Sequence, residues 1–381
     1  MNKKEISEIK KQLSPEHCAI TRISGCYVNA DKEKVTEFTE AFLSLPEEDM
    51  YKYFEILRKV LSGTLRKNLM EIEFPLAEEG QDGKQTFLYS LVRDRICSEE
   101  KLSDYYDRVI TCCPLSENYL ILIIHAAYDV PGRANDQLEM FDASDETYHF
   151  LISCVCPVAL SKPGLSYDAG ENRFHERIRD WVVGMPELGF LFPSFTDRRS
   201  DIHQVLYYSR NAADLHADYL DGMFGCHPMF NAPQEKETFT SLVEETLGEE
   251  CDYDIVRELH QQLHEYTQEH KDSPDPVTLG PGDVKNLLSQ SGASSETLDT
   301  FEDHFTRSAG EHTEFAAANI SSSKHFEVRT ADVLIQVSPD RADLVERRTI
   351  DGRACLVIPI TDEVVVNGIR VKNKPVSDYQ Q

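Results

Sequence analysis

The sequence is poor in positive charge and has no apolar run long enough to cross a membrane. It contains 39 basic against 67 acidic side chains, for a net charge of −28. A field of this sign repels DNA, RNA and anionic lipid surfaces, so we expect neither a nucleic-acid partner nor membrane binding. The apolar run at 119–128 is far shorter than the roughly 20 residues of a membrane-spanning helix.

Paired cysteine motifs and the common nucleotide-binding motifs are also missing. The ten cysteines form no C-x-x-C pair, and several lie in apolar runs, where a free thiol behaves as a small hydrophobic group. Residues 1–8 contain no apolar stretch typical of secretion, so we expect a reducing, cytoplasmic environment. The sequence has no P-loop, no G-x-G-x-x-G after a strand, no G-x-S-x-G and no EF-hand. It therefore predicts no particular cofactor.

Two apolar runs, 119–128 and 148–156, are the strongest structural signal. Both are short, rich in β-branched and aromatic residues, and separated by a polar, mostly acidic connection. Runs of this kind are typical of strands buried on both faces, which need packed layers on either side. We therefore expect an α+β fold with these two strands side by side in the interior.

Periodicity predicts the other elements of a first domain at 1–225. Ser44 and Glu47 form a capping-box pattern before a helix, and we expect the strands at 70–76 and 86–92 to pair as a hairpin. No regular alternation of strands and helices is present, which favours a largely antiparallel sheet with packed helices. The predicted elements are helices at 6–13, 44–61 and 98–109, and strands at 19–29, 70–76, 86–92, 188–195 and 202–210.

The remaining sequence predicts two further parts. An acidic helical segment occupies 234–310, with thirteen acids against three bases between 235 and 275. A polar linker is expected at 309–324, and a small β-rich module at 325–381. Within this module Asn367-Gly368 is a strong signal for a type I′ hairpin turn, because both positions of that turn need positive φ.

Arginine placement is the most suggestive functional feature. The guanidinium group suits phosphate or carboxylate, and the loop 197–203 lies between two predicted strands, where functional groups often sit. The interpretation we favour is that these arginines pair with surface carboxylates, and the alternative is a site for an anionic small molecule. The candidate ligand-binding residues are Arg95, His125, Arg177, Arg198, Arg199 and His203.

The spacing of histidines and cysteines gives only weak evidence for a catalytic or metal site. His125 and His149 lie within the two central runs, where we favour hydrogen-bonded core histidines. Asp129 follows the first run, and a general-base pair of a histidine with this aspartate is the alternative. Metal-like spacing occurs twice without the further ligands that a metal needs, so we predict no metal site. These pairs are Cys154 with Cys156 and His260 with His264.

Three segments carry a resemblance to a known family. They are MNKKEISEIKKQLSPEHCAITRISGCYV at the start, AFLSLPEEDMYKYF from Ala41 and YDVPGR from Tyr128. They resemble the domain-of-unknown-function family numbered 4317, found mainly in anaerobic Firmicutes. The resemblance implies a bacterial, cytoplasmic origin, and it implies no catalytic residues.

The leading hypothesis is a non-enzymatic protein that binds a protein partner or a small ligand. The alternative is an enzyme acting on a phosphorylated or nucleotide-like molecule at the arginine-bearing loops. A third hypothesis, an acidic mimic of nucleic acid, rests on charge alone. An enzyme should bring Arg198 and Arg199 together with a histidine or carboxylate in one pocket, whereas a binding module should show a broad apolar patch.

Overall fold

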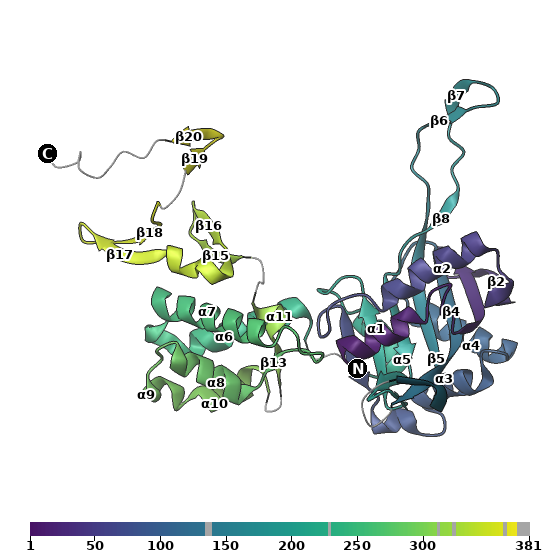
Figure 1. Ribbon diagram of the computed structural model, residues 1–381, viewed down its shortest axis with the longest axis horizontal. Coiled ribbons are helices and arrows are strands. Elements are labelled where there is room, and N and C mark those ends of the chain that lie inside the picture. The colour runs from purple at the N-terminus through teal and green to yellow at the C-terminus, as the bar shows by residue number, and fades with distance from the viewer. Residues whose placement is uncertain (134–138, 228–229, 311–312, 322–324, 361–363, 372–381) are drawn as a thin grey trace. The chain divides into compact units, whose positions relative to one another are not determined.

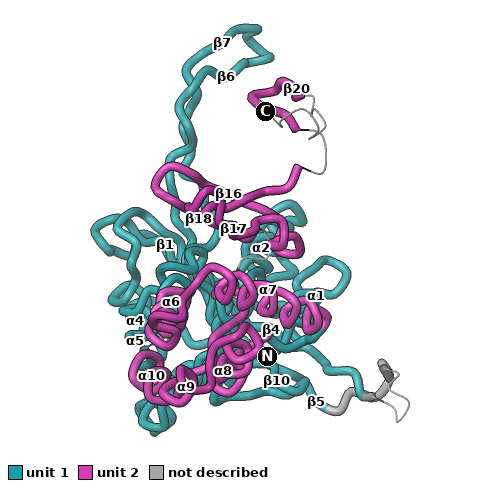
Figure 2. The backbone as a smooth tube through the Cα atoms, turned by 90° about the vertical axis from the view of Figure 1, so that its left-hand side faces the viewer, with its two compact units in different colours: residues 1–235, 273–276 teal, residues 236–272, 277–381 magenta. Residues whose placement is uncertain are grey.

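The chain folds into two compact units. The computed structural model describes residues 1–133, 139–227, 230–310, 313–321, 325–360 and 364–371. Unit 1 comprises residues 1–235 with 273–276, and unit 2 comprises residues 236–272 with 277–381 (Figure 2). Helices and antiparallel strands are mixed, which confirms the predicted α+β class. In the described residues, no helix has both the length and the apolar character needed to cross a membrane.

An antiparallel sheet forms the centre of unit 1 (Figure 1). Its strands are ordered β2-β1-β4-β5-β9-β12-β3, and β8 also pairs with β5. The predicted strands at 119–128 and 148–156 lie within β4 and β5, which pair directly with Leu122 opposite Cys154. The strands are β1 (Ile20–Val28), β2 (Lys34–Ala41), β3 (Leu69–Glu73), β4 (Tyr119–Arg133), β5 (Glu139–Leu160), β8 (Trp181–Val183), β9 (Leu188–Phe192) and β12 (Gln204–Ser209).

Both faces of this sheet are covered by helices, because the central strands are apolar on both sides. Alternate residues such as Ile123 and Leu151 belong to one buried cluster, and Ile124 and Phe150 belong to another. The first cluster includes residues of α3 (Lys84–Asp94), α4 (Glu99–Cys112) and α5 (Ala217–Phe224). The second includes residues of α1 (Lys3–Lys11) and α2 (Glu47–Val60). The sheet is therefore the middle of three layers.

Two local predictions for unit 1 are wrong. Ser44 does not cap α2, because its hydroxyl donates to the carbonyl of Ala41 and Pro46 occupies the N-cap position. The segment 86–92 is not a strand but lies in α3. Strand β3 instead pairs with β12, with Ile72 opposite Val205. A short apolar run fits a strand or a buried helix, and here the three-and-four spacing of buried residues shows that the helix prevails.

A two-stranded ribbon extends β5 away from the sheet. Strand β8 pairs with the last residues of β5, and β6 (Leu165–Asp168) pairs with β7 (Arg173–Glu176) beyond it (Figure 1). We call residues 160–185 the arm. Nine large apolar side chains of the arm are 37% to 79% exposed.

Unit 2 has a helical core of its own. Phe239, Leu259, Leu288, Phe301 and Phe315 belong to one buried cluster. Residues 309–324 were expected to form a polar linker, and this is wrong where they are described, because Phe315 and Ile320 are buried. The elements are α6 (Ala232–Leu247), η3 (Gly248–Glu250), α7 (Tyr253–Glu269), β13 (Thr278–Leu279), α8 (Pro281–Gln290), α9 (Ser295–Leu298), α10 (Phe301–Ser308), β14 (Phe315–Ala316) and α11 (Ala317–Ile320).

Three antiparallel hairpins follow the helices, as the β-rich pattern predicts. Asn367 and Gly368 have φ of 49° and 84°, which confirms the predicted positive-φ turn between the last two strands. The pairs are β15 (Phe326–Arg329) with β16 (Leu334–Val337), β17 (Glu346–Ile350) with β18 (Arg353–Val357), and β19 (Val364–Val366) with β20 (Ile369–Val371); η4 (Pro339–Leu344) lies between the first two.

Candidate functional site

Arg198 and Arg199, although adjacent in sequence, have different surroundings. They follow β10 (Ser194–Thr196) in a tight hairpin with β11 (Arg199–Asp201). Asp197 and Arg198 occupy its turn with φ of 52° and 58°. The side chain of Arg198 is 14% exposed, and its guanidinium lies 3.0 Å from the Glu8 carboxylate. Arg198 is thus held in an ion pair, while Arg199 lines a surface hollow.

This hollow, of about 490 Å³, contains one of the predicted histidines. His203 lines it together with Arg199, and its Nδ1 lies 2.7 Å from Oε1 of Glu79. The hydrogen bond to Glu79 raises the pKa of His203. Two carboxylates, Asp197 and Asp201, also line the hollow. The single guanidinium is therefore outnumbered by acids, which disfavours an anionic ligand at this place.

His125 is fully buried on β4 and forms no pair with Asp129. Its Nδ1 lies 2.7 Å from Thr21 Oγ1, whereas Asp129 accepts a hydrogen bond from Thr147. The pKa of His125 is lowered to about 4, mainly by burial and also by electrostatic interactions with His149, Arg95 and Arg22. The histidine is neutral at pH 7 and belongs to the sheet interior.

The other two predicted arginines stand apart from the hairpin hollow. Arg95 is exposed at the C-cap of α3 in a left-handed conformation, with φ of 53°. It is one of the charges that act on His125. Arg177 is exposed on the arm. The structure thus brings Arg199 near His203 and Arg95 near His125, and it places Arg177 elsewhere.

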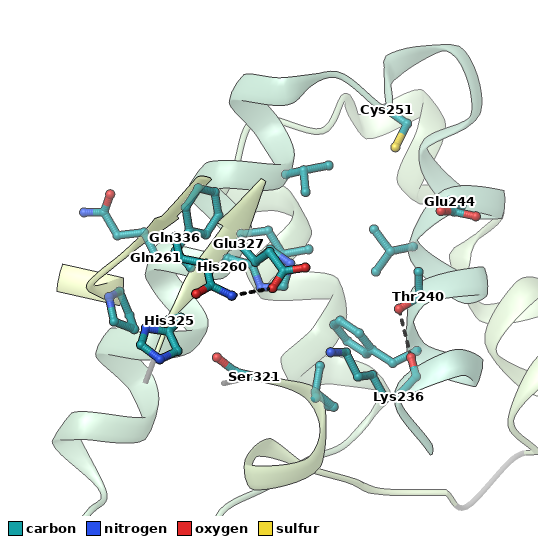
Figure 3. Close-up of a pocket in the computed structure, with 17 residues that line it drawn as sticks. Lys236, Thr240, Glu244, Cys251, His260, Gln261, Ser321, His325, Glu327 and Gln336 are labelled. Atoms are coloured by element: carbon teal, nitrogen blue, oxygen red, sulfur yellow. Dashed lines mark hydrogen bonds between the residues drawn. The ribbon is translucent and has the colours of Figure 1, made fainter. Parts of the chain in front are cut away.

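A groove of about 520 Å³ lies in unit 2. Helices α6 and α7 supply an apolar lining that includes Phe239, Val243 and Leu259, and Phe326 of β15 adds an aromatic ring. Figure 3 shows Lys236, Thr240 and Glu244 along one side. Its volume is within the usual range of small-molecule sites, and apolar walls are typical of them.

Two glutamine side chains in this groove each donate one hydrogen bond to a neighbouring carboxylate. Nε2 of Gln336 donates to Glu327 Oε2 at 2.9 Å (Figure 3). Nε2 of Gln261 donates to Glu265 Oε1 at 3.1 Å. The amide oxygens and the remaining carboxylate lone pairs are acceptors. The groove therefore offers carboxylate and amide oxygens to a ligand on this side, beside the second N–H of each amide.

His260 and Lys236 also line the groove. The His260 ring packs edge-on against Phe326, with centroids 6.1 Å apart. Burial lowers the pKa of His260, and the nearby Lys236 charge acts in the same direction. The imidazole is therefore neutral at pH 7. Carboxylates of Glu244 and Glu327 outnumber the one lysine in the lining.

Sequence reasoning missed this groove because its residues are spread from 236 to 339. The one signal in the sequence was the His260–His264 spacing, which lacks the further ligands that a metal needs. Among the residues that the structure describes, no group of three or more His, Cys, Asp and Glu side chains is arranged to hold a metal ion.

Comparisons with known proteins place the chain in a family. No curated protein matches it, and no solved structure matches it. Residues 1–369 match the family described as Domain of unknown function (DUF4317). The match confirms the family that the opening segments resemble, and it covers nearly the whole chain. The protein is therefore a member of the DUF4317 family.

Proposed function

We propose that this protein is a non-enzymatic binding protein of the bacterial cytoplasm, and that it takes an amphipathic amine in the groove of unit 2. The observation that carries the proposal is the combination of an apolar wall with two carboxylates, Glu244 and Glu327, in the lining of the same groove. An aromatic or aliphatic body fits between Phe239 and Phe326. A protonated nitrogen can donate to lone pairs of the Glu327 and Glu244 carboxylates, and its charge suits a chain of net charge −28.

A matched set of three probes tests the charge preference. Phenethylamine, 2-phenylethanol and hydrocinnamate share an aromatic body and differ in the terminal group. Binding to the folded state raises the melting temperature by mass action. We expect stabilisation by the amine, less by the alcohol and none by the carboxylate. Equal effects of all three, or a preference for the carboxylate, would contradict the proposal.

Variants of the groove test the place of binding. Glu327→Gln removes one carboxylate while keeping its size, and we expect about tenfold weaker amine binding, or about 1.4 kcal/mol. Phe239→Ala should weaken the amine and the alcohol alike, because it removes apolar contact. Glu249→Gln is the control, since Glu249 is exposed and outside the groove lining. Calorimetric titration gives all three affinities.

One observation favours a second function, an enzyme at the β10–β11 hairpin. A carboxylate that orients a histidine is a common general-base arrangement, and Glu79 holds His203 in this way beside Arg199. If an anionic substrate binds there, Arg199→Ala should abolish stabilisation by inorganic phosphate or by a nucleotide. Stabilisation that survives Arg199→Ala would end this alternative.

A further inference from the structure

The arm exposes apolar side chains on a ribbon that has only two strands. Trp181, Val182 and Val183 of β8 are 56%, 51% and 37% exposed. Their only strand partner in the described residues is β5, through Val158, Ala159 and Leu160. Two-stranded ribbons are marginally stable in water, and open edges favour pairing with another chain. The arm therefore has both an uncovered apolar surface and an uncovered edge.

Hydrogen bonds show which backbone groups reach the open edge. The amide of Gly184 donates to Pro157, and the amide of Ser161 donates to Asp180. Antiparallel ladders alternate, so the backbone of Val182 is directed at β5. The N–H and C=O groups of Trp181 and Val183 are directed at the other edge. These two residues flank Val182 symmetrically.

We infer that the arm is a dimerisation element, in which the open edge of β8 pairs antiparallel with β8 of a second copy about a two-fold axis at Val182. In this register Trp181 lies opposite Val183 of the second copy, and Val183 lies opposite its Trp181. Each pair exchanges two backbone hydrogen bonds. Each also places an aromatic ring beside a β-branched side chain, which is a favourable cross-strand combination.

The balance of charges on the arm favours a second copy of this chain as its binding partner. Residues 160–185 contain four basic and four acidic side chains, whereas the whole chain has a net charge of −28. Two copies repel one another over most of their surface, and the neutral arm is where this repulsion is weakest. A two-fold interface brings the same patch together twice, so a patch with equal numbers of both charges is self-complementary.

The exposed apolar area of the whole arm is comparable to that of a standard interface. Nine large apolar side chains that are about half exposed present an area on the order of 800 Å² for each copy, since a large side chain buries up to about 200 Å². A standard stable interface buries about that area per partner. Burial of Trp181 should therefore accompany association.

Trp181 is the only tryptophan of the chain, so its fluorescence reports directly on the arm. We expect sedimentation of the full chain to show dimers as its concentration rises through about 1 to 100 µM, with a blue shift of the emission maximum over the same range. Val183→Lys should leave the chain monomeric and the emission unshifted, because an edge lysine blocks strand pairing. A chain that stays monomeric throughout overturns the proposal, and so does a Val183→Lys variant that still dimerises.

A cysteine at the axis tests the register. Residues that face each other in a non-hydrogen-bonded pair have Cα atoms about 4.5 Å apart, which permits a disulfide. Val182→Cys should therefore form a covalent dimer under mild oxidation at least about tenfold faster than Ile178→Cys, whose thiol is offset from the axis. The native chain, with its own exposed Cys97 and Cys251, gives the background rate. Equal rates for the two variants would refute the axis at Val182.

Discussion

Neighbouring residues in this chain can have separate roles, and Arg198 and Arg199 are the clearest case. The Arg198 guanidinium contacts Glu8, whose carboxylate also accepts a hydrogen bond from Tyr128. Arg199 lies in the open hollow beside His203. Arg198 therefore ties the β10–β11 hairpin to α1, and Arg199 is the residue that a ligand could meet.

Single substitutions should separate these two roles. Arg198→Ala removes a partly buried charged partner of Glu8, so we expect the free energy of unfolding to fall by about 1–3 kcal/mol. Arg199→Ala should change it by less than about 0.5 kcal/mol, as is usual for exposed residues. Urea denaturation measures both. If the Arg199 variant loses as much stability as the Arg198 variant, the assignment is wrong.

His125 makes stability depend on pH. Its pKa of about 4 in the folded protein lies below the ordinary value of 6.5. Between these two values the unfolded chain binds a proton that the folded chain does not, so stability falls as pH falls from 6.5 towards 4. The total loss is about 3 kcal/mol. His125→Gln should flatten the stability curve over this window, and an unchanged slope in pH-dependent urea unfolding would contradict the prediction.

At the scale of elements, small residues determine how closely layers approach the sheet. Gly189 of β9 lies where a Cβ atom would be 2.6 Å from the carbonyl oxygen of Ser153 and 3.0 Å from a Val60 methyl group. Helix α2 can therefore pack directly on this part of the sheet. A larger residue would separate β5, β9 and α2.

Gly189→Ala should destabilise the protein by about 1–3 kcal/mol, the usual cost of overpacking. Gly164→Ala is the matched control, because no atom lies within 4 Å of a Cβ added there. Thermal unfolding monitored by circular dichroism compares the two. A Gly189 variant as stable as the control would show that the layers can separate without cost.

At the scale of the whole molecule, the two units have separate apolar cores. Phe301 is fully buried in the core of unit 2, where its ring contacts Phe305. The two sheet clusters belong to unit 1. A substitution that destabilises one core should therefore increase local unfolding first in its own unit.

Phe301→Ala tests this separation. The substitution should cost about 3–5 kcal/mol and accelerate amide hydrogen exchange in α7, α8 and α10. Exchange in β4 and β5 should stay as in the native protein. Mass spectrometry of peptides from both units measures the difference, and faster exchange in the sheet strands would show that the two cores unfold together.

Local patterns predicted the central strands, most helices and the Asn367-Gly368 turn, because each depends on residues close together in the sequence. Burial on both faces requires apolar runs, and a positive φ favours asparagine and glycine. The α+β class follows from these elements. The segment 86–92 was predicted wrongly because a short apolar run fits either periodicity, and only its packing against the sheet distinguishes them.

The tertiary structure alone decided which side chains meet. Arg198 donates a hydrogen bond to Glu8, which lies 190 positions away in the sequence. His203 is hydrogen-bonded to Glu79, which lies 124 positions away. The groove of unit 2 joins residues of α6, α7 and the β15–β16 hairpin. Such contacts depend on how apolar faces pack after the elements form, and no local preference encodes the distances between them. The sequence by itself therefore determined the elements and the fold class, and packing determined the candidate sites.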